Sequence, residues 1–247
     1  MKALSPLLSV TLLIFSLCSH AEDLTLTTDK GFALKTSYYE SNHANDRAVL
    51  LLHQCNYNRS MYNDIGQQLS EQGIHALSLD FRGFGESANE EFSVEKVQAM
   101  PRKERRAAWQ KMSAHWPSDV QLAYDHLTSK LSDKGIVGVL GASCGGSQAI
   151  TLSENNPINV IGFFSSGQRD ENIARYKKTM AGKPTLIIAS EGDTGTYESA
   201  QELFKTSTND SSKFIAYKGS EHGYPLLDRD KQLASYIVGW LDSQLSK

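Results

Sequence analysis

A serine flanked by glycines carries the clearest chemical signal in this sequence. Gly141, Ser143 and Gly145 form a G-x-S-x-G element that follows an apolar run, Ile136 to Leu140, and opens a helical pattern. A nucleophile on a sharp strand-to-helix turn needs small neighbours, because the strained backbone crowds its flanks. The alternative is a glycine-containing turn with an incidental serine, but the flanking strand and helix patterns favour a nucleophile. The sequence therefore predicts that Ser143 is a nucleophile above the end of a strand.

One histidine can serve this serine as general base. A serine hydroxyl is a poor nucleophile until a histidine takes its proton and a carboxylate orients that histidine. With a serine on such a turn, the acid and then the histidine follow along the chain. The only histidine after Ser143 is His222, in a loop just past the apolar run Phe214 to Tyr217. We expect His222 to be the base.

Two carboxylates compete for the role of orienting this histidine. Glu191 and Asp193 both follow the apolar run Thr185 to Ala189, with Gly192 between them. We expect Asp193, because a short side chain after a flexible glycine can turn toward His222. Glu191 is more easily a solvated loop residue, although the chemistry tolerates either residue type.

A loop after the apolar run Ala48 to Leu52 is expected to complete the site. Two backbone N–H groups must bind the oxygen on which negative charge develops, one from the residue after the nucleophile and one from this loop. These residues are Cys144 and Cys55, since His53-Gln54-Cys55 closes the apolar run. We expect His53 to be a structural histidine that hydrogen-bonds the loop backbone.

The elements that position these residues alternate between short apolar runs and helical patterns. Leu24–Leu26 and Leu34–Tyr39 alternate apolar and polar residues, which predicts an antiparallel hairpin at a sheet edge. Continuous apolar runs, typical of strands covered on both faces, are Ala48–Leu52, Ala76–Leu79, Ile136–Leu140, Val160–Phe164, Thr185–Ala189 and Phe214–Tyr217. Helical patterns occupy Ser60–Gly73, Ser118–Leu131, Gly145–Glu154, Tyr197–Lys205 and Asp228–Leu245. This alternation predicts an α/β fold with a mostly parallel central sheet, helices on both faces, and ligands bound beyond the carboxyl ends of the strands.

One stretch interrupts the alternation. Ser87 to Trp116 is long and predicts a small helical insertion after the fourth strand, beginning a helix near Pro101. We expect this lid-like segment, residues 87–116, to lie over the mouth of the site, with Trp109 and Met112 facing apolar substrate or the sheet. Its cations are read as a solvated helix face, with substrate recognition as the alternative; they are Arg102, Lys103, Arg105, Arg106 and Lys111.

Residues 1–21 have the pattern of a secretory signal peptide. Lys2 precedes an apolar run from Leu7 to Leu17, and Ser19-His20-Ala21 places small residues at the −3 and −1 positions. A membrane anchor is disfavoured, because the run is shorter than the ~20 residues of a spanning helix. We expect cleavage before Glu22 and a periplasmic or secreted protein with no stable membrane anchor.

The remaining residues, 22–247, are expected to form one domain. A length of 247 residues with 40% hydrophobic composition gives room for one sizeable core. The formal net charge of −3 shows no basic excess of the kind that nucleic-acid binding leaves in composition. Composition therefore favours a small-molecule substrate over a nucleic-acid partner, and it leaves the oligomeric partner open.

A further motif leads to a family resemblance. Asp80 to Ser87 reads D-F-R-G-F-G-E-S, which resembles the D-x-R-G-x-G-x-S turn after the fourth strand of α/β-hydrolases. With this turn, Ser143, Asp193 and His222 in the expected order, nearly the whole of residues 22–247 resembles an α/β-hydrolase of the dienelactone hydrolase and esterase type. In that family the Asp80 turn is structural, so the resemblance implies no catalytic role for Asp80 or Arg82.

The resemblance has two departures. Gln54 stands where the family usually has a glycine after its histidine, and Ser143 stands where dienelactone hydrolases have a cysteine. The second departure weakens any prediction of dienelactone substrates. The resemblance implies instead the hydrolysis of a small-molecule carboxylic ester through an acyl-enzyme, without a cofactor. No cluster of ligands with metal-site spacing is present in the sequence.

Other uses of the same residues stay open. A thioesterase or an acyltransferase differs only in leaving group or acceptor, and a non-catalytic binding protein could keep the fold. A cysteine redox protein is disfavoured, because Cys55 and Cys144 have nothing like C-x-x-C spacing.

The two cysteines of residues 22–247 lead to a hypothesis of their own. If the N–H groups of Cys55 and Cys144 converge on one oxygen, their α-carbons come within the range of roughly 4.4 to 6.8 Å that a disulfide requires. Export makes oxidation available. We hypothesise a Cys55–Cys144 disulfide that stiffens the oxyanion hole; two separate buried thiols are the alternative, because side-chain direction is not visible in the sequence.

Overall fold

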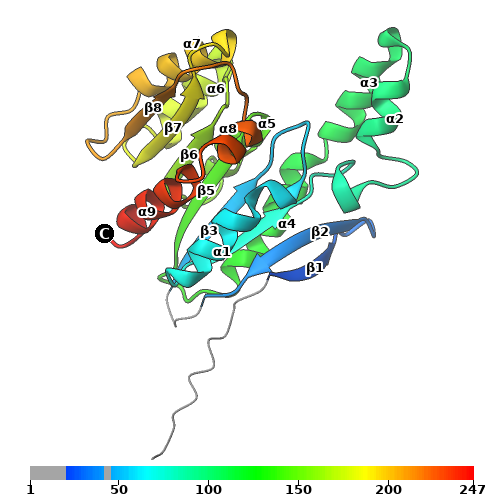
Figure 1. Cartoon of the computed structure of the whole chain (residues 1–247). Helices are drawn as coiled ribbons and strands as arrows, with labels where there is room; N and C mark the ends of the chain where they lie inside the picture. Colours follow the sequence, from blue (N-terminus) through cyan, green and yellow to red (C-terminus); the bar gives the residue numbers. More distant parts are fainter. Residues whose placement is uncertain (1–20, 42–45) are drawn as a thin grey trace, which may run out of the picture.

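An eight-stranded sheet forms the centre of the computed structural model, which describes residues 21–41 and 46–247 (Figure 1). The strand order is β1-β2-β4-β3-β5-β6-β7-β8. Strands β3 to β8 are parallel, whereas β1 and β2 form an antiparallel hairpin at one edge and β2 runs antiparallel to β4. The strands are β1 Glu22–Thr27, β2 Ala33–Tyr39, β3 Arg47–Leu52, β4 His75–Leu79, β5 Ile136–Ala142, β6 Val160–Phe164, β7 Thr185–Ser190 and β8 Lys213–Tyr217.

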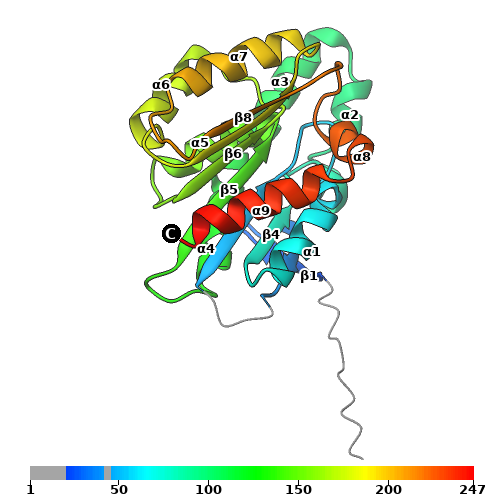
Figure 2. The ribbon, with the colours of Figure 1, turned by 60° about the vertical axis from the view of Figure 1, so that its left-hand side comes forward.

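Helices cover both faces of this sheet (Figures 1 and 2). One hydrophobic core lies beneath α4, α5, α6 and α7, and a second lies beneath α1, α8 and α9. The α-helices are α1 Asn63–Glu71, α2 Val94–Ala99, α3 Arg102–Ser113, α4 Trp116–Thr128, α5 Cys144–Ser153, α6 Asp170–Thr179, α7 Thr194–Lys205, α8 Tyr224–Arg229 and α9 Leu233–Leu245. Two short 3₁₀ helices are η1 Arg59–Tyr62 and η2 Gly85–Ser87.

The two cores explain why the central strands are mostly apolar on both of their faces. In β3, Leu50 and Leu52 belong to the core beneath α4 and α5, whereas Val49 and Leu51 belong to the core beneath α1 and α9. Successive side chains of a strand point to opposite faces, so a strand covered on both sides must be apolar throughout. The predicted mostly parallel sheet with helices on both faces is confirmed.

Two helical segments differ from the sequence prediction. Helix α6 was not predicted, because it is mostly polar and fully buries only Tyr176 among its ten residues. The single helix expected over Asp228–Leu245 is two helices, α8 and α9. The chain is extended at Asp230, whose carboxylate accepts hydrogen bonds from Tyr217 Oη at 2.6 Å and Gln232 N at 3.0 Å. These hydrogen bonds to the Asp230 carboxylate stabilise the extended backbone that separates α8 from α9.

The segment Ser87–Trp116 leaves the alternation of strands and helices as the sequence predicts. It carries α2 and α3, a pair that projects from the rest of the fold in Figure 1. Met112, near the end of α3, is buried in the core, whereas residues 102–107 at its start are exposed. The insertion is therefore anchored at its base and open to solvent at its tip.

The predicted signal peptide lies almost wholly outside the described residues, which begin at Ala21. The first strand starts at Glu22, the residue before which cleavage was predicted. Within the described part of the chain, no helix has the length and apolar character needed to cross a membrane.

Candidate active site

Ser143 lies on a sharp turn between β5 and α5. Its backbone has φ 49° and ψ −116°, in a region that residues with a side chain rarely adopt. A Cβ atom at Gly141 would lie 2.5 Å from the backbone of Gly145, and one at Gly145 would lie 2.2 Å from the carbonyl oxygen of Leu52. Both glycines of the G-x-S-x-G element are therefore required by the close approach of the backbone.

The three residues predicted as nucleophile, base and acid meet at the carboxyl end of the sheet. His222 Nε2 lies 2.8 Å from Ser143 Oγ, and His222 Nδ1 lies 2.5 Å from Asp193 Oδ2. A carboxylate accepts hydrogen bonds, so Nδ1 carries a proton toward Asp193 and Nε2 can accept the proton of the serine hydroxyl. This arrangement suits the transfer of a proton from Ser143 to His222.

Hydrogen bonds between two loops hold the acid beside the histidine. The Gly192 N–H donates to the carbonyl of Gly219 at 2.7 Å. The hydroxyl of Ser190, at the end of β7, donates to the carbonyl of Glu221 at 2.7 Å. These bonds join the loop after β7 to the loop after β8, which carries His222. Sequence reasoning missed Ser190, although a serine that ends an apolar strand at the carboxyl edge was a visible signal.

Glu191 is directed elsewhere. Its carboxylate pairs with Lys218 Nζ at 2.5 Å, and its side chain is 38% exposed. The structure therefore brings Asp193, and not Glu191, to the histidine. The residue types alone permitted either one.

Cys55 and Cys144 are joined by a disulfide, with their Cα atoms 5.8 Å apart. Cys144 is the first residue of α5, and Cys55 belongs to the loop after β3. Among the described residues, neither N–H donates to a backbone carbonyl. The N–H of Cys144 also lies at the positive end of the dipole of α5. Two donors suited to a developing oxyanion thus lie in segments that the disulfide holds together.

His53 has the structural role predicted for it. Its Nδ1 lies 2.7 Å from the carbonyl of Gln54, and its Nε2 accepts the Phe81 N–H at 2.9 Å. Because these partners are an acceptor and a donor, Nδ1 carries the proton and the ring is neutral. Full burial lowers the pKa of His53 to about 4, which favours the same neutral form.

A polar segment after β6, residues 165–168, hydrogen-bonds the backbone of the turn that carries Ser143. Ser166 Oγ donates to the carbonyl of Ser143 at 2.5 Å, and Gln168 Nε2 donates to Ser166 Oγ at 2.6 Å. Ser166 and Gln168 are both buried. Sequence reasoning missed these residues; the signal was a short polar run directly after a strand that neighbours β5.

The base of the insertion packs beside the loop after β3, residues 53–55, which was predicted to help bind the oxyanion and is called the oxyanion loop below. The ring of Phe84 lies 5.2 Å from His53 and 6.1 Å from Trp109. Trp109 also contacts Trp116 at 5.6 Å between ring centroids. The insertion therefore meets the fold at the carboxyl ends of β3 and β4, on the edge of the sheet where Ser143 lies.

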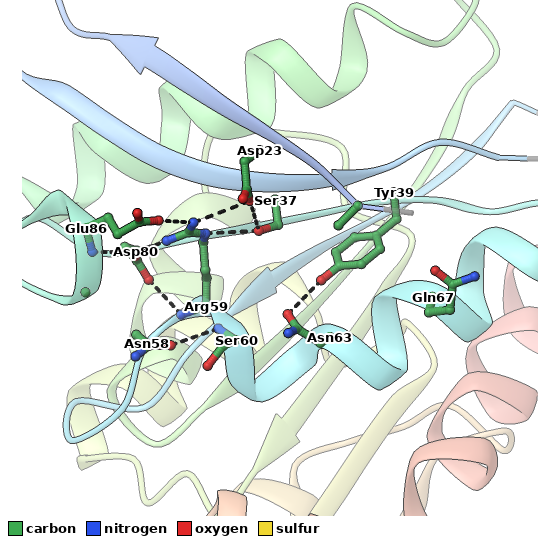
Figure 3. Close-up of a pocket in the computed structure, with 12 residues that line it drawn as sticks. Asp23, Ser37, Tyr39, Asn58, Arg59, Ser60, Asn63, Gln67, Asp80 and Glu86 are labelled. Carbon is green, nitrogen blue, oxygen red and sulfur yellow. Dashed lines mark hydrogen bonds and ion pairs between the residues drawn. The ribbon is translucent and has the colours of Figure 1, made fainter. Parts of the chain in front are cut away.

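The Asp80 turn contributes ion pairs to a surface cavity of about 510 Å³, lined by residues of β2, η1, α1 and this turn (Figure 3). Arg59 Nη1 pairs with Asp80 at 2.5 Å, Arg59 Nε donates to Ser37 Oγ at 3.0 Å, and a further nitrogen of Arg59 pairs with Glu86. The guanidinium nitrogens of Arg59 therefore have their hydrogen-bond acceptors within the protein. The cavity is lined by neither Ser143 nor His222, and its charges serve the fold.

Arg82 has a structural environment as well. Its guanidinium binds Asp119 through two hydrogen bonds of 3.1 and 2.7 Å, and it lies 4.0 Å over the ring of Phe32. Burial raises the pKa of Asp119, and the adjacent guanidinium opposes that shift. Both groups are buried, so this pair joins the turn after β4, which precedes the insertion, to α4, which follows it. In the described residues, no group of three His, Cys, Asp or Glu side chains is placed to hold a metal ion.

Solved structures of similar fold include several esterases. A cold-adapted esterase from an Arctic intertidal metagenomic library has a TM-score of 0.68 at 18% identity, over 91% of this chain and 93% of its own. An esterase from Pyrococcus furiosus has a TM-score of 0.66 at 17% identity, over 97% of each chain. A thermostable carboxyl esterase from Bacillus coagulans has a TM-score of 0.68 at 11% identity, over 92% of this chain and 99% of its own. These likenesses show the shared fold.

Sequence comparison identifies the family. No curated protein matches the sequence. The model of the Hydrolase_4 family, described as serine aminopeptidase, S33, matches residues 43–169, which is more than half of the chain. The expected dienelactone hydrolase subtype is not supported by this match, whereas the α/β-hydrolase fold is. The chain belongs to the Hydrolase_4 family of α/β-hydrolases.

Proposed function

We propose that this chain is a serine hydrolase that cleaves carboxylic esters of small molecules. The observation that carries the proposal is the continuous line of hydrogen bonds from Asp193 through His222 to Ser143. The esterases among the proteins of similar fold agree with this choice of substrate class.

The proposed reaction proceeds through an acyl-enzyme. Ser143 Oγ attacks the ester carbonyl while His222 Nε2 takes its proton, and Asp193 stabilises the imidazolium that forms. The Cys144 and Cys55 N–H groups bind the oxyanion. His222 then protonates the leaving alcohol. Water, deprotonated by the same histidine, attacks the acyl carbon, and the acid leaves as Ser143 regains its proton.

A panel of p-nitrophenyl esters of increasing acyl length tests the proposal, run on the protein from Glu22 onward and on Ser143→Ala. We expect turnover by the parent protein, none above background by the variant, and labelling of Ser143 by a fluorophosphonate probe. Absence of both turnover and labelling would favour a non-catalytic binding protein. Faster cleavage of acyl thioesters, or transfer to added alcohols, would favour a thioesterase or an acyltransferase. An aminoacyl p-nitroanilide tests for peptidase activity in the same assay.

We also propose that residues 1–21 are removed during export and that residues 22–247 form the mature domain. The start of β1 at Glu22 supports this boundary. The test is N-terminal sequencing of protein recovered from the periplasm or medium of an expressing bacterium. A chain that begins at Glu22 agrees with the proposal, and an intact Met1 in the cytoplasm contradicts it.

We further propose that the insertion, residues 87–116, lies over the mouth of the site, shapes access to Ser143 and takes no part in bond breaking. The packing of Trp109 on Phe84, beside the oxyanion loop, supports this role. Loops at the carboxyl edge of such sheets commonly determine access and specificity.

A further inference from the structure

We infer that Gln54 is a positioning residue that holds His222 in line with Ser143. This inference rests on the proposed role of His222 as general base. Gln54 is one of the two departures from the family that the sequence resembles, which usually has a glycine at this position, and only 1% of Gln54 is exposed. Its Oε1 accepts the backbone N–H of Tyr224 at 2.7 Å. A side chain of the oxyanion loop thus binds the backbone two residues beyond the histidine.

The local structure selects this contact. Tyr224 is the first residue of α8, so its N–H has no acceptor within the helix, and the preceding Gly223 has no side chain to cap it. Gly223 has φ +70°, and a Cβ atom there would lie 1.8 Å from Gln54 Oε1. A glycine at position 223 therefore leaves the space that the glutamine amide fills.

The orientation of the amide is fixed from the other side. Gln54 Nε2 donates to Asn56 Oδ1 at 2.5 Å, which leaves Oε1 directed at Tyr224. The ring of Tyr57 stacks on that of Tyr224, with centroids 4.3 Å apart. The loop after β3 and the start of α8 are thus joined by a hydrogen bond and a ring stack.

The backbone is consequently held by hydrogen bonds both before and after His222. Before it, the Glu221 carbonyl accepts the Ser190 hydroxyl; after it, the Tyr224 N–H donates to Gln54. The neighbour of Gln54, Cys55, is bonded to Cys144, which follows Ser143. Two adjacent residues, 54 and 55, therefore connect the base segment to the nucleophile segment. Displacing a reacting group by about 1 Å can cost about 100-fold in rate, so this connection bears on turnover.

The test compares two substitutions that differ in the acceptor. Gln54→Met keeps the unbranched shape and removes the acceptor, whereas Gln54→Glu keeps an acceptor for the Tyr224 N–H. Gln67→Met, on α1 at the surface cavity that neither Ser143 nor His222 lines, is the matched control. We expect Gln54→Met to lower kcat by roughly 10- to 100-fold with KM within about twofold. Gln54→Glu should recover only part of this loss, because its carboxylate can accept from the Tyr224 N–H but cannot donate to Asn56 Oδ1 as the amide does. Gln67→Met should match the parent protein. The rate of Ser143 labelling by a fluorophosphonate should follow kcat.

Several results would overturn the inference. A folded Gln54→Met protein with kcat within about twofold of the parent would show that the contact is dispensable. Equal losses in Gln54→Met and Gln54→Glu, with Gln54→Glu as stable to urea as the parent protein, would show that the acceptor is not what matters. If Gln54→Met does not fold, Gln54→Gly provides the same comparison, with wild-type kcat as the contradicting result. A parent protein that neither turns over esters nor is labelled would instead contradict the proposed function.

Discussion

Cys55 and Cys144 are bonded to each other directly beside Ser143, across 89 residues of sequence. The bond connects the loop after β3 to the first residue of α5, and these are the two segments proposed to bind the oxyanion. Either cysteine can lose its sulfur and keep its backbone N–H. The contribution of the covalent tie can therefore be measured apart from that of the two N–H donors.

Removing this disulfide should lower activity as well as stability. The variant Cys55→Ala/Cys144→Ala retains both donors, so a fall in kcat would report their loss of alignment. Closure of so long a loop stabilises the folded state by about 4 kcal/mol in the chain-entropy model. Urea denaturation of parent and variant, with ester turnover below both transitions, measures the two effects. Thiol titration of denatured, exported protein is the check on the bond itself: two free thiols would contradict it.

Substitution of the proposed triad should abolish turnover without unfolding the protein. We expect Ser143→Ala and His222→Ala each to lower kcat by about 10⁴-fold or more, and their combination to add little, because the residues act as a unit. Circular dichroism should show that both variants stay folded. Additive losses would contradict a shared role.

The choice of acid can be tested with a matched pair of substitutions. Asp193→Asn removes the charge beside His222 Nδ1 and should be severe. Glu191→Gln breaks a surface pair with Lys218 and should leave kcat within about twofold, since exposed ion pairs contribute little. The opposite order of effects would assign the acid to Glu191.

The buried His53 should make the protein less stable in weak acid. In the unfolded chain a histidine has a pKa near 6.5, whereas burial lowers the pKa of His53 to about 4 in the fold. Between these values the unfolded chain binds a proton that the folded chain does not. The free energy of unfolding should therefore decrease by roughly 1.4 kcal/mol per unit as pH falls from about 6.5 to about 4.

Denaturant titrations at several pH values measure this dependence, with His53→Gln as the comparison. Burial also lowers the pKa values of His75 and His126, which contribute to the same slope. The informative quantity is thus the difference in slope between the parent and the variant. Identical slopes would show that His53 binds its proton equally well in the folded and the unfolded chain, which contradicts the prediction.

The insertion offers a contrast between its tip and its base. Replacing the four exposed cations Arg102, Lys103, Arg105 and Arg106 with glutamine should leave the turnover of a neutral ester within about twofold, as for other solvated surface changes. Trp109→Ala removes a ring that packs on Phe84 and should change KM and the preferred acyl length. A larger effect of the tip substitutions on an anionic ester than on a neutral one would assign the cations to substrate recognition.

Much of the fold was predictable because burial on two faces leaves a strong pattern. The run Ala48–Leu52 falls within β3, and the Ser143 element falls at the end of β5, where the motif requires it. Helix α6 was not predicted, because a single buried residue, Tyr176, does not produce a recognisable helical period of apolar residues. The direction of a side chain was also invisible, which is why the sequence left Cys55 and Cys144 open between a disulfide and two thiols.

The site was predictable in part for a related reason. Chain order and strand ends indicated which histidine and which carboxylates could reach Ser143, since parallel strands bring their carboxyl ends to one edge. Chain order could not indicate the partners that orient them. Gln54 was visible only as a departure from the family pattern, because its contact with Tyr224 spans 170 residues of sequence.

The wide separation of the site segments has a consequence for how the protein acquires its activity. Ser143 and His222 are 79 residues apart in the chain, and His222 follows β8, the last strand of the sheet. Forming a contact between segments that are distant in sequence costs loop-closure entropy, and this cost slows folding. The local helices can form long before these loops meet. We therefore expect ester turnover to return later than helical signal after dilution from denaturant, so that enzymatic activity reports the final step of refolding.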